Sequence, residues 1–252
     1  MGPAGVHSRG MADQGPSAVV SGASSGMGLA VAERFVAEGW RVFALDLDAA
    51  GLARIHAELG KSLVPLAVDI RSRSAVEAAL GSVRDAGPVR AVVNAAGIYP
   101  TSTLADYTED DYRRIFDVNV LGTLHVTAAA VAVIRTHGGG GAIVNFASID
   151  AFAVSRGQLL YSASKAAIVS ITRSLAIELA AEQISVNAIA PGWVATPGTL
   201  AGGRIDEAVK SVPLGRAASP EEIADWVWKL GSTPGSYLTG ETIVISGGLV
   251  MR

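Results

Sequence analysis

The sequence predicts one α/β domain with a doubly wound, parallel sheet of seven strands and helices on both faces. Short apolar runs alternate with helix-length segments at intervals of about 20 to 30 residues, the pattern of repeated strand–helix–strand units. The runs are apolar at nearly every position, which is typical of strands that are buried on both faces. With 252 residues, 50% of them hydrophobic and 17% charged, the chain is long enough for one large core and too apolar for a disordered protein.

Each expected strand is a short run rich in Val, Ile, Leu, Phe or Ala. Each run ends at, or within two residues of, a turn-forming Ser, Gly, Asp, Asn or Pro. In chain order the seven strands are expected at residues 17–20, 41–45, 63–68, 91–94, 142–146, 185–189 and 242–245.

Four helices are expected from apolar residues at three- and four-residue spacing. The first ends before Gly39, a residue type that favours the left-handed conformation after a helix. The second holds the most hydrophobic stretch of the chain, but Gly122 interrupts it and Arg135 ends it, so we expect a buried helix and no membrane span. The last begins at Pro220. In chain order the four helices are expected at residues 26–38, 109–135, 161–181 and 220–230.

Residues 1–16 combine Gly, Pro, Ala and Ser without apolar periodicity, and they lack the apolar segment of a secretory signal. We expect a disordered leader, either native or left by cloning, with Met11 as an alternative start. The folded, NAD-binding domain is expected at residues 17–252.

Composition excludes several classes of function. Twenty basic and 23 acidic residues give a net charge of −3, which offers no footprint for nucleic acid or an anionic membrane. The absence of Cys excludes disulfides, thiolate metal sites and thiol nucleophiles. None of the four His lies in a ligand motif, so no metal is expected. We expect a cytoplasmic protein that acts on a small molecule.

The first chemical signal is the glycine-rich turn Ser21-Gly22-Ala23-Ser24-Ser25-Gly26-Met27-Gly28, which follows the first strand. It leads into a helix whose N-terminus offers free N–H groups and a positive dipole end to a phosphate. Glycines let the backbone approach a pyrophosphate closely. The spacing is Gly-x-x-x-Gly-x-Gly, without the Lys of a P-loop. The turn favours a dinucleotide, and a turn without a ligand remains the alternative.

Polar residues recur where the next strands end. A carboxylate at Asp46 is placed to accept hydrogen bonds from the adenosine ribose hydroxyls and to repel a 2′-phosphate. Leu47 and Ser25 occupy positions where a basic residue would attract that phosphate, so the sequence favours NAD over NADP. Asp48 competes with Asp46 for this role. The same edge of the sheet is expected to hold Asp69 and the run Asn94-Ala95-Ala96-Gly97.

The second chemical signal is Tyr161-Ser162-Ala163-Ser164-Lys165, which places a phenol and an ammonium on one helical face. We expect the buried ammonium to lower the pKa of Tyr161 toward the working pH, as a general acid–base group needs. Ser148, at the end of the fifth strand, offers a hydroxyl to a substrate carbonyl or alcohol. Asn119 is a poor helix former inside the long helix, which indicates a hydrogen-bonding role.

In their order along residues 17–248, these motifs resemble the short-chain dehydrogenase/reductase family, which implies a Rossmann-type fold and a nicotinamide cofactor. The resemblance implies that Tyr161 gives or takes the proton and that Ser148 polarises the reacting carbonyl. It implies that Lys165 lowers the pKa of the tyrosine and holds the nicotinamide ribose, while Asn119 fixes a water in a proton relay. The implied cofactor-binding positions are Gly22, Ser24, Ser25, Gly26, Met27, Gly28, Asp46, Asp69, Asn94, Ala95, Ala96, Gly97, Tyr161, Lys165, Pro191, Gly192, Val194 and Thr196.

Three residues depart from the family's pattern. Ser21 replaces the usual Thr, Ala95 a common second Asn, and Ser246 the usual Asp. The last difference puts C-terminal packing and subunit contacts in doubt. The family otherwise implies a homotetramer or homodimer that uses the two long helices and the last strand.

The expected activity is NAD-dependent oxidation of a secondary alcohol to a ketone. Asp150 and Gln158 indicate a hydroxylated substrate such as a sugar, polyol or cyclic diol, and Trp193 is expected to stack on a ring. The pocket is expected to include Ser148, Ile149 and Tyr99, with residues 197–212 as a lid. Two alternatives remain: a ketone reductase for a polyketide or acyl intermediate, and a non-catalytic dinucleotide-binding regulator.

Overall fold

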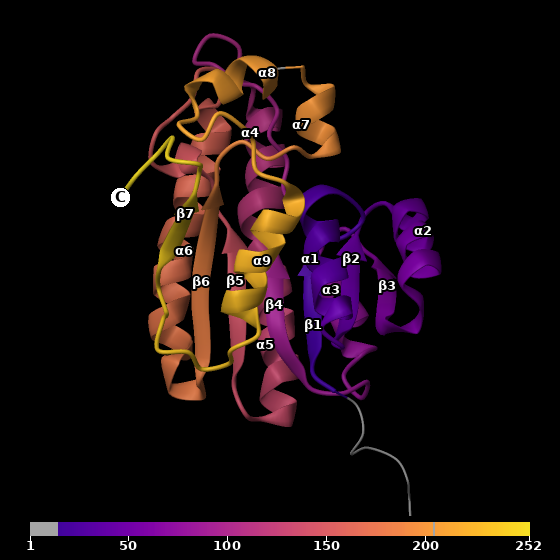
Figure 1. Ribbon diagram of the computed structural model, residues 1–252. Helices are drawn as coiled ribbons and strands as arrows, with labels where there is room; N and C mark the ends of the chain where they lie inside the picture. The colour runs from indigo at the N-terminus through magenta and orange to yellow at the C-terminus, as the bar shows by residue number, and fades with distance from the viewer. Residues whose placement is uncertain (1–14, 204) are drawn as a thin grey trace, which may run out of the picture.

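The computed structural model describes residues 15–203 and 205–252, and the expected leader lies outside them up to residue 14. All seven expected strands are present and pair in parallel in the order β3-β2-β1-β4-β5-β6-β7 (Figure 1). The predicted seven-stranded, doubly wound sheet is therefore confirmed. The strands are β1 (Ser17–Ser21), β2 (Arg41–Asp46), β3 (Leu63–Ala67), β4 (Val89–Asn94), β5 (Gly141–Phe146), β6 (Ile184–Pro191) and β7 (Thr242–Ile245).

The described helices include the four expected ones, and four that the sequence analysis does not predict. Helices α7 and α8 have five and four residues, too few to show a helical period. Helices α2 and α3 do bury apolar residues at helical spacing, Leu52 and Ile55 in α2 and Val76 and Leu80 in α3, and the sequence analysis missed them. The helices are α1 (Gly26–Ala37), α2 (Ala49–Leu59), α3 (Arg73–Gly81), α4 (Glu109–Phe116), α5 (Thr123–His137), α6 (Leu159–Leu179), α7 (Pro197–Ala201), α8 (Ile205–Ala208) and α9 (Pro220–Gly231).

Helices cover both faces of the sheet. Helices α1, α2 and α9 enclose one core, where Val20 and Val93 meet side chains such as Leu52 and Val227. Helices α3, α5 and α6 cover the other face, where alternate residues of the same strands point. Because the strands are buried on both sides, their runs are apolar at nearly every position.

The expected helix at residues 109–135 consists of α4, a π-helical turn at Asp117–Gly122, and α5. By length and composition alone, Glu109–His137 would pass for a membrane span. In the structure, 56% of its apolar window is buried inside the protein, as expected of a core helix. The π-helical turn carries the buried Asn119, and π-helical turns are frequent at functional sites.

The strand order decides where a ligand can bind. The chain builds outward from β1 to β3 in one direction and from β4 to β7 in the other. The connections after β1 and β4 therefore diverge and leave a crevice at the carboxyl ends of these two strands. Helices α7 and α8, which follow β6, lie at this same end of the molecule (Figure 1).

An aromatic cluster packs between α1 and α9 on one face of the sheet. The ring of the fully buried Phe35 meets Trp40 edge-on at 5.2 Å and Trp228 at 5.0 Å between centroids. The same ring reaches Gly231, where an added Cβ would lie 3.0 Å from it. The cluster thus joins the first helix of the domain to the last.

Replacing Phe35 by Ala should lower the free energy of unfolding by about 3–5 kcal/mol, because it leaves a large cavity among rigid neighbours. Urea denaturation, followed by circular dichroism, measures this change. The control is Tyr237→Ala at a fully exposed site, which should leave the stability unchanged. A loss of less than about 1 kcal/mol in Phe35→Ala would show that the core can collapse around the missing ring.

Candidate functional site

The crevice between β1 and β4 opens into a cleft of about 520 Å³, within the size range of small-molecule sites. Twelve of the predicted cofactor positions line it, and they come from the glycine-rich turn, from the ends of β2 and β3, and from the loops after β4 and β6. They are Gly22, Ser24, Ser25, Gly26, Met27, Gly28, Asp46, Asp69, Ala95, Ala96, Gly97 and Thr196.

Two glycines bring the backbone close together at the bottom of this cleft. A Cβ on Gly22 would lie 2.7 Å from the backbone of Ala96, and a Cβ on Gly28 would lie 2.0 Å from the carbonyl oxygen of Gly22. Gly22 also has φ +70°, in the left-handed region that favours glycine. The turn after β1 can therefore pack against the loop after β4 and the start of α1 only with these glycines. This is the close approach that a pyrophosphate site requires.

The structure distinguishes Asp46 from its competitor Asp48. Asp46 lines the cleft, and its carboxylate accepts hydrogen bonds from the backbone N–H groups of Ser24 and Asp48, both at 3.0 Å. The Asp48 side chain instead caps α2 by accepting from the N–H of Gly51 at 3.0 Å. Asp46 is thus the carboxylate that is held at the cleft.

Basic side chains that the sequence analysis missed also line the cleft. Arg71 follows β3 and pairs with Asp69, whereas Arg114 comes from α4. The proximity of Arg71 to Asp69 in the sequence was the available signal for the first. No local pattern places Arg114 beside the glycine-rich turn, because only the tertiary structure brings α4 there.

Asn94 does not line the cleft, although its position at a strand end led us to expect it at the cofactor. Its side-chain amide is buried and donates to Thr127 Oγ1 at 2.9 Å and to Asn145 Oδ1 at 2.8 Å. Asn145 in turn donates to Thr172 Oγ1 at 2.9 Å. This buried chain joins β4 and β5 to α5 and α6 beneath the site.

Tyr161 and Lys165 lie one turn apart on α6, beside the end of β5. The Lys165 side chain is buried, its Nζ donates to the carbonyl oxygen of Phe146 at 2.7 Å, and it lies 5.7 Å from the centre of the Tyr161 ring. Gly97 of the cofactor cleft packs close by, since a Cβ there would lie 3.5 Å from that Nζ. The ammonium therefore lies between the tyrosine and the cleft wall.

Asn119 connects the loop after β4 to the turn of helix that carries Tyr161. Its Oδ1 accepts from the N–H of Ile98 at 2.8 Å, and its Nδ2 donates to the Ile98 carbonyl at 2.9 Å and to Ser164 Oγ at 3.0 Å. Ser164 donates to the carbonyl oxygen of Tyr161 at 2.7 Å. Both side-chain donor hydrogens of Asn119 are thus engaged, so the residue ties the loop after β4 to α6.

The expected direction of the Tyr161 pKa shift is wrong for the protein without a ligand. Burial disfavours the phenolate and raises the pKa of Tyr161 to about 12, although a hydrogen bond with Ser148 opposes this shift. The nearby Asp150 carboxylate raises it further. Burial also lowers the pKa of Lys165 to about 8. The sequence argument counted the attraction between the two groups and omitted the cost of burying each charge.

A second cavity, of about 190 Å³, adjoins the cleft and contains the predicted substrate residues. Tyr99, Met27, Thr196 and Gly198 line both cavities, so the two meet there. The expected substrate and remaining cofactor positions in its wall are Ser148, Ile149, Asp150, Gln158, Tyr161, Trp193, Pro191, Gly192 and Val194.

Some polar groups of the second cavity have hydrogen-bond partners among the described residues, and one has none. The Gln158 side chain is 7% exposed, and its Oε1 has no hydrogen-bond partner among the described residues. Its backbone is fixed by a bridge to Ser102, whose N–H donates to the Gly157 carbonyl at 2.9 Å. Asp150 accepts from the N–H of Ser155 at 3.0 Å. Among the described residues that line this cavity there is no Arg, Lys or His, and Asp150 is the one carboxylate.

The low pKa of Lys165 predicts a measurable pH dependence of stability. Between pH about 8 and about 10.5 the unfolded chain holds the lysine proton and the folded chain does not, so the free energy of unfolding should rise with pH. Over this whole pH range the free energy of unfolding should rise by about 3 kcal/mol. Urea denaturation across this range should show that rise in the wild type and not in Lys165→Met. The exposed control Lys61→Met should keep the wild-type slope, and an equal slope in Lys165→Met would contradict the assignment.

Comparisons with known proteins identify the family of the chain. A family model described as enoyl-(acyl carrier protein) reductase matches residues 22–250. The (3R)-3-hydroxyacyl-CoA dehydrogenase of Mus musculus is 35% identical over 93% of this chain and 96% of its own. The galactitol 2-dehydrogenase (L-tagatose-forming) of Cereibacter sphaeroides is 36% identical over 93% of this chain and 94% of its own. The crystal structure of 3-ketoacyl-(acyl-carrier-protein) reductase from Brucella melitensis, complexed with NADH, has a TM-score of 0.89 at 31% identity and covers 95% of this chain and 100% of that one. The chain therefore belongs to the short-chain dehydrogenase/reductase family, oxidoreductases that act on CH–OH groups.

Proposed function

We propose that this enzyme uses NAD to oxidise a secondary alcohol of a small, uncharged, hydroxylated molecule to a ketone, with a sugar, polyol or cyclic diol as the substrate class. The observation that carries the proposal is the junction of the two cavities. The cleft lined by the glycine-rich turn and Asp46 opens, past Tyr99 and Thr196, into the cavity that holds Tyr161 and Ser148. A dinucleotide in the first cavity would meet a substrate in the second at these residues.

In this mechanism Tyr161 takes the proton from the substrate hydroxyl, while the Ser148 hydroxyl hydrogen-bonds the same oxygen. The nicotinamide group, when bound, supplies the hydride acceptor and a positive charge that favours the phenolate. Lys165, which lies between the tyrosine and the cofactor cleft, adds a second positive charge and a donor for ribose hydroxyls. Asn119 holds the catalytic helix against the loop after β4.

Asp46 supports NAD as the cofactor in preference to NADP. Two backbone N–H groups fix its carboxylate at the cleft, where a negative charge favours ribose hydroxyls and repels a 2′-phosphate. Leu47 next to it is 71% exposed and offers no positive charge. The NADH complex of the related Brucella melitensis reductase is consistent with this choice.

The charge of the substrate cavity supports an uncharged, hydroxylated substrate. Asp150 repels carboxylates and phosphates, and none of the described side chains that line the cavity offers them a positive charge. Gln158 and Asp150 instead offer acceptors to hydroxyl groups. The galactitol dehydrogenase among the relatives acts on a substrate of this class.

A ketone reductase for a β-ketoacyl or polyketide intermediate is the second candidate. The names of the Mus musculus and Brucella melitensis relatives favour it. Reduction of ketones with NADPH, together with no oxidation of alcohols with NAD, would place this candidate first.

The protein's assembly and location are also part of the proposal. Around β7, α9 and the C-terminus, the apolar side chains of Trp226, Leu238 and Met251 are exposed, which supports a homodimer or homotetramer. Sedimentation as a monomer at micromolar concentration would contradict it. We propose a cytoplasmic location, with which the absence of Cys from the sequence is consistent.

The first experiment is to follow reduced nicotinamide by absorbance, with NAD and NADP separately, against sugars, polyols, cyclic diols, hydroxysteroids and simple secondary alcohols. Tyr161→Phe should retain less than about a tenth of the wild-type turnover, because it removes the proton acceptor and leaves the ring. Its NAD binding, measured by calorimetry, should stay close to that of the wild type. A higher residual turnover would refute the role of Tyr161.

Gln158→Leu should separate substrates by their extra hydroxyl groups. The variant removes an acceptor and keeps the volume, so kcat/KM for cyclohexane-1,2-diol should fall about ten-fold while that for cyclohexanol stays unchanged. Gln158→Glu keeps an acceptor and should retain more activity on the diol than Gln158→Leu. Equal losses on both alcohols would mean that Gln158 does not read the second hydroxyl.

A further inference from the structure

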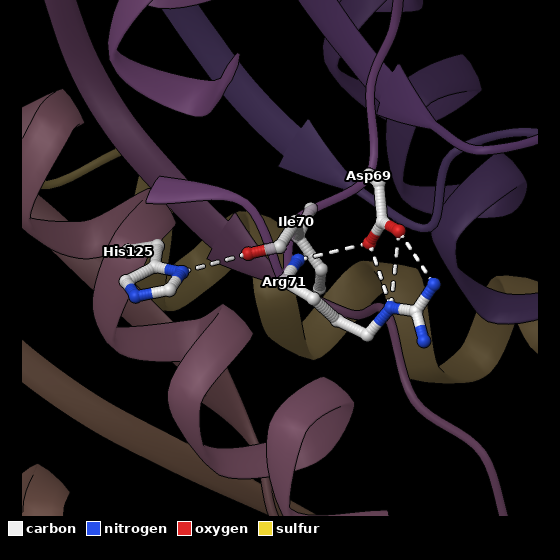
Figure 2. A network of polar contacts seen from close by, with 4 residues as sticks. All are labelled: Asp69, Ile70, Arg71 and His125. Atoms are coloured by element: carbon white, nitrogen blue, oxygen red, sulfur yellow. Dashed lines mark hydrogen bonds and ion pairs between the residues drawn. The ribbon is translucent and has the colours of Figure 1, made fainter. Parts of the chain in front are cut away.

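The rim of the cofactor cleft carries a charged pair that the proposed mechanism does not use. Arg71 Nε lies 3.0 Å from both carboxylate oxygens of Asp69, and Arg71 Nη2 donates to Asp69 Oδ2 at 2.6 Å (Figure 2). The backbone N–H of Arg71 also donates to Asp69 Oδ1 at 2.9 Å. Both side chains line the cleft. The pair is thus a fixed part of the wall where β3 ends.

The backbone between the two residues is anchored from the opposite side. The carbonyl oxygen of Ile70 lies 2.9 Å from Nδ1 of His125 on α5 (Figure 2). The Ile70 side chain packs on Gly122, where an added Cβ would lie 2.6 Å from it. Since the turn is held by α5 and by its own ion pair, the orientation of Arg71 is set before a ligand binds. The Arg71 hydrogen bonds also lower the pKa of Asp69, which keeps its carboxylate charged.

The pair presents acceptors and donors side by side. The Asp69 carboxylate has lone pairs that Arg71 does not use. These can accept hydrogen bonds, and an ionised carboxylate has no hydrogen to donate. The guanidinium has five N–H donors, of which Nε–H and one hydrogen of Nη2 face Asp69, so three remain. The edge of adenine offers the complementary set: an amino donor at N6 and ring-nitrogen acceptors beside it.

We propose that Arg71 is a positioning and specificity residue for the adenine base of the cofactor, to which it offers its free guanidinium donors while it orients the Asp69 carboxylate. The inference rests on the proposed dinucleotide site and adds a residue to it. It concerns the adenosine half of the cofactor, away from Tyr161 and the reacting atoms. Arg71 therefore acts on cofactor affinity and leaves the chemical step unchanged.

Two simpler roles make different predictions. A purely structural surface ion pair contributes little to stability and would not affect binding. A general electrostatic attraction for phosphate would be served equally by Lys and would affect every phosphate-containing ligand. The neighbouring Arg73 provides the matched control, because it pairs with Glu77 at 2.8 Å, is 69% exposed and does not line the cleft.

The test is calorimetric titration of the wild type, Arg71→Met, Arg71→Lys and Arg73→Met with NAD, 5′-AMP and nicotinamide mononucleotide. Arg71→Met should weaken NAD and 5′-AMP about ten-fold, because it removes charge-assisted donors and keeps the side-chain stem. Nicotinamide mononucleotide, which has a phosphate and no adenine, should bind all four proteins equally. Arg71→Lys should resemble Arg71→Met, because an ammonium lacks the planar arrangement of donors. Arg73→Met should bind like the wild type.

Several outcomes would overturn the inference. Wild-type affinity for NAD and 5′-AMP in Arg71→Met would leave the ion pair structural only. Equal weakening of the mononucleotide, or full rescue by Arg71→Lys, would assign the effect to charge alone. A lower thermal unfolding midpoint together with weakening of all three ligands would assign it to the fold. Failure of the wild type to bind NAD at all would instead refute the proposed function itself.

Discussion

The site depends on the strand order of the sheet, because the connections that follow the central strands β1 and β4 leave them in opposite directions. Strand order runs outward from β1 to β3 and from β4 to β7, so no crossover helix covers the carboxyl ends of β1 and β4. The close contact of Gly22 with the Ala96 backbone then joins the two diverging loops. The larger cavity, the glycine-rich turn and the polar strand ends all follow from this arrangement, because they occupy the same edge.

The site also requires polar groups to be buried beside a dry core, and the structure satisfies most of them with one another. Asn94, Asn145 and Thr172 form a continuous chain of hydrogen bonds that links β4 and β5 to α6. Asn119 uses its whole amide to connect the loop after β4 to α6. A satisfied network of this kind rigidifies its surroundings. The side-chain carbonyls of Asn94 and Gln158 both lack a hydrogen-bond partner among the described residues. Of the two, Gln158 lines the substrate cavity, so it is the one that we expect to receive a ligand.

Burial shifts the pKa values of Tyr161 and Lys165 in a way that suits the proposed activation by a bound cofactor. The pKa of Tyr161 is raised to about 12 and that of Lys165 is lowered to about 8, so near pH 7 the phenol is neutral while most of Lys165 keeps its positive charge. A positive charge beside them would favour the phenolate. In the proposed mechanism, proton abstraction would then be efficient only when the oxidised cofactor is bound, because without it Tyr161 would stay a protonated phenol.

The sequence by itself determined the seven strands, the long helices and most of the residues around the cleft. These features depend on local signals: apolar runs, glycine spacing and a Tyr–Lys pair on one helical face. Helices α7 and α8 escaped prediction because they are too short to set a period, whereas the apolar spacing in α2 and α3 was a signal that the sequence analysis missed. Asn94 could not be assigned from sequence, since a polar strand end can point to the ligand or into the core, and here Thr127 and Asn145 hold it inside.

Only the tertiary structure decided which distant residues reach the site and in which direction its pKa values shift. The position of Arg114 at the cleft depends on where α4 packs, and the choice of Asp46 over Asp48 depends on which carboxylate caps α2. The direction of the Tyr161 pKa shift depends on how completely its surroundings exclude water. Sequence spacing records which residues are near along the chain or on one helix. Desolvation and hydrogen-bond partners come from distant segments, so they appear only when the chain is folded.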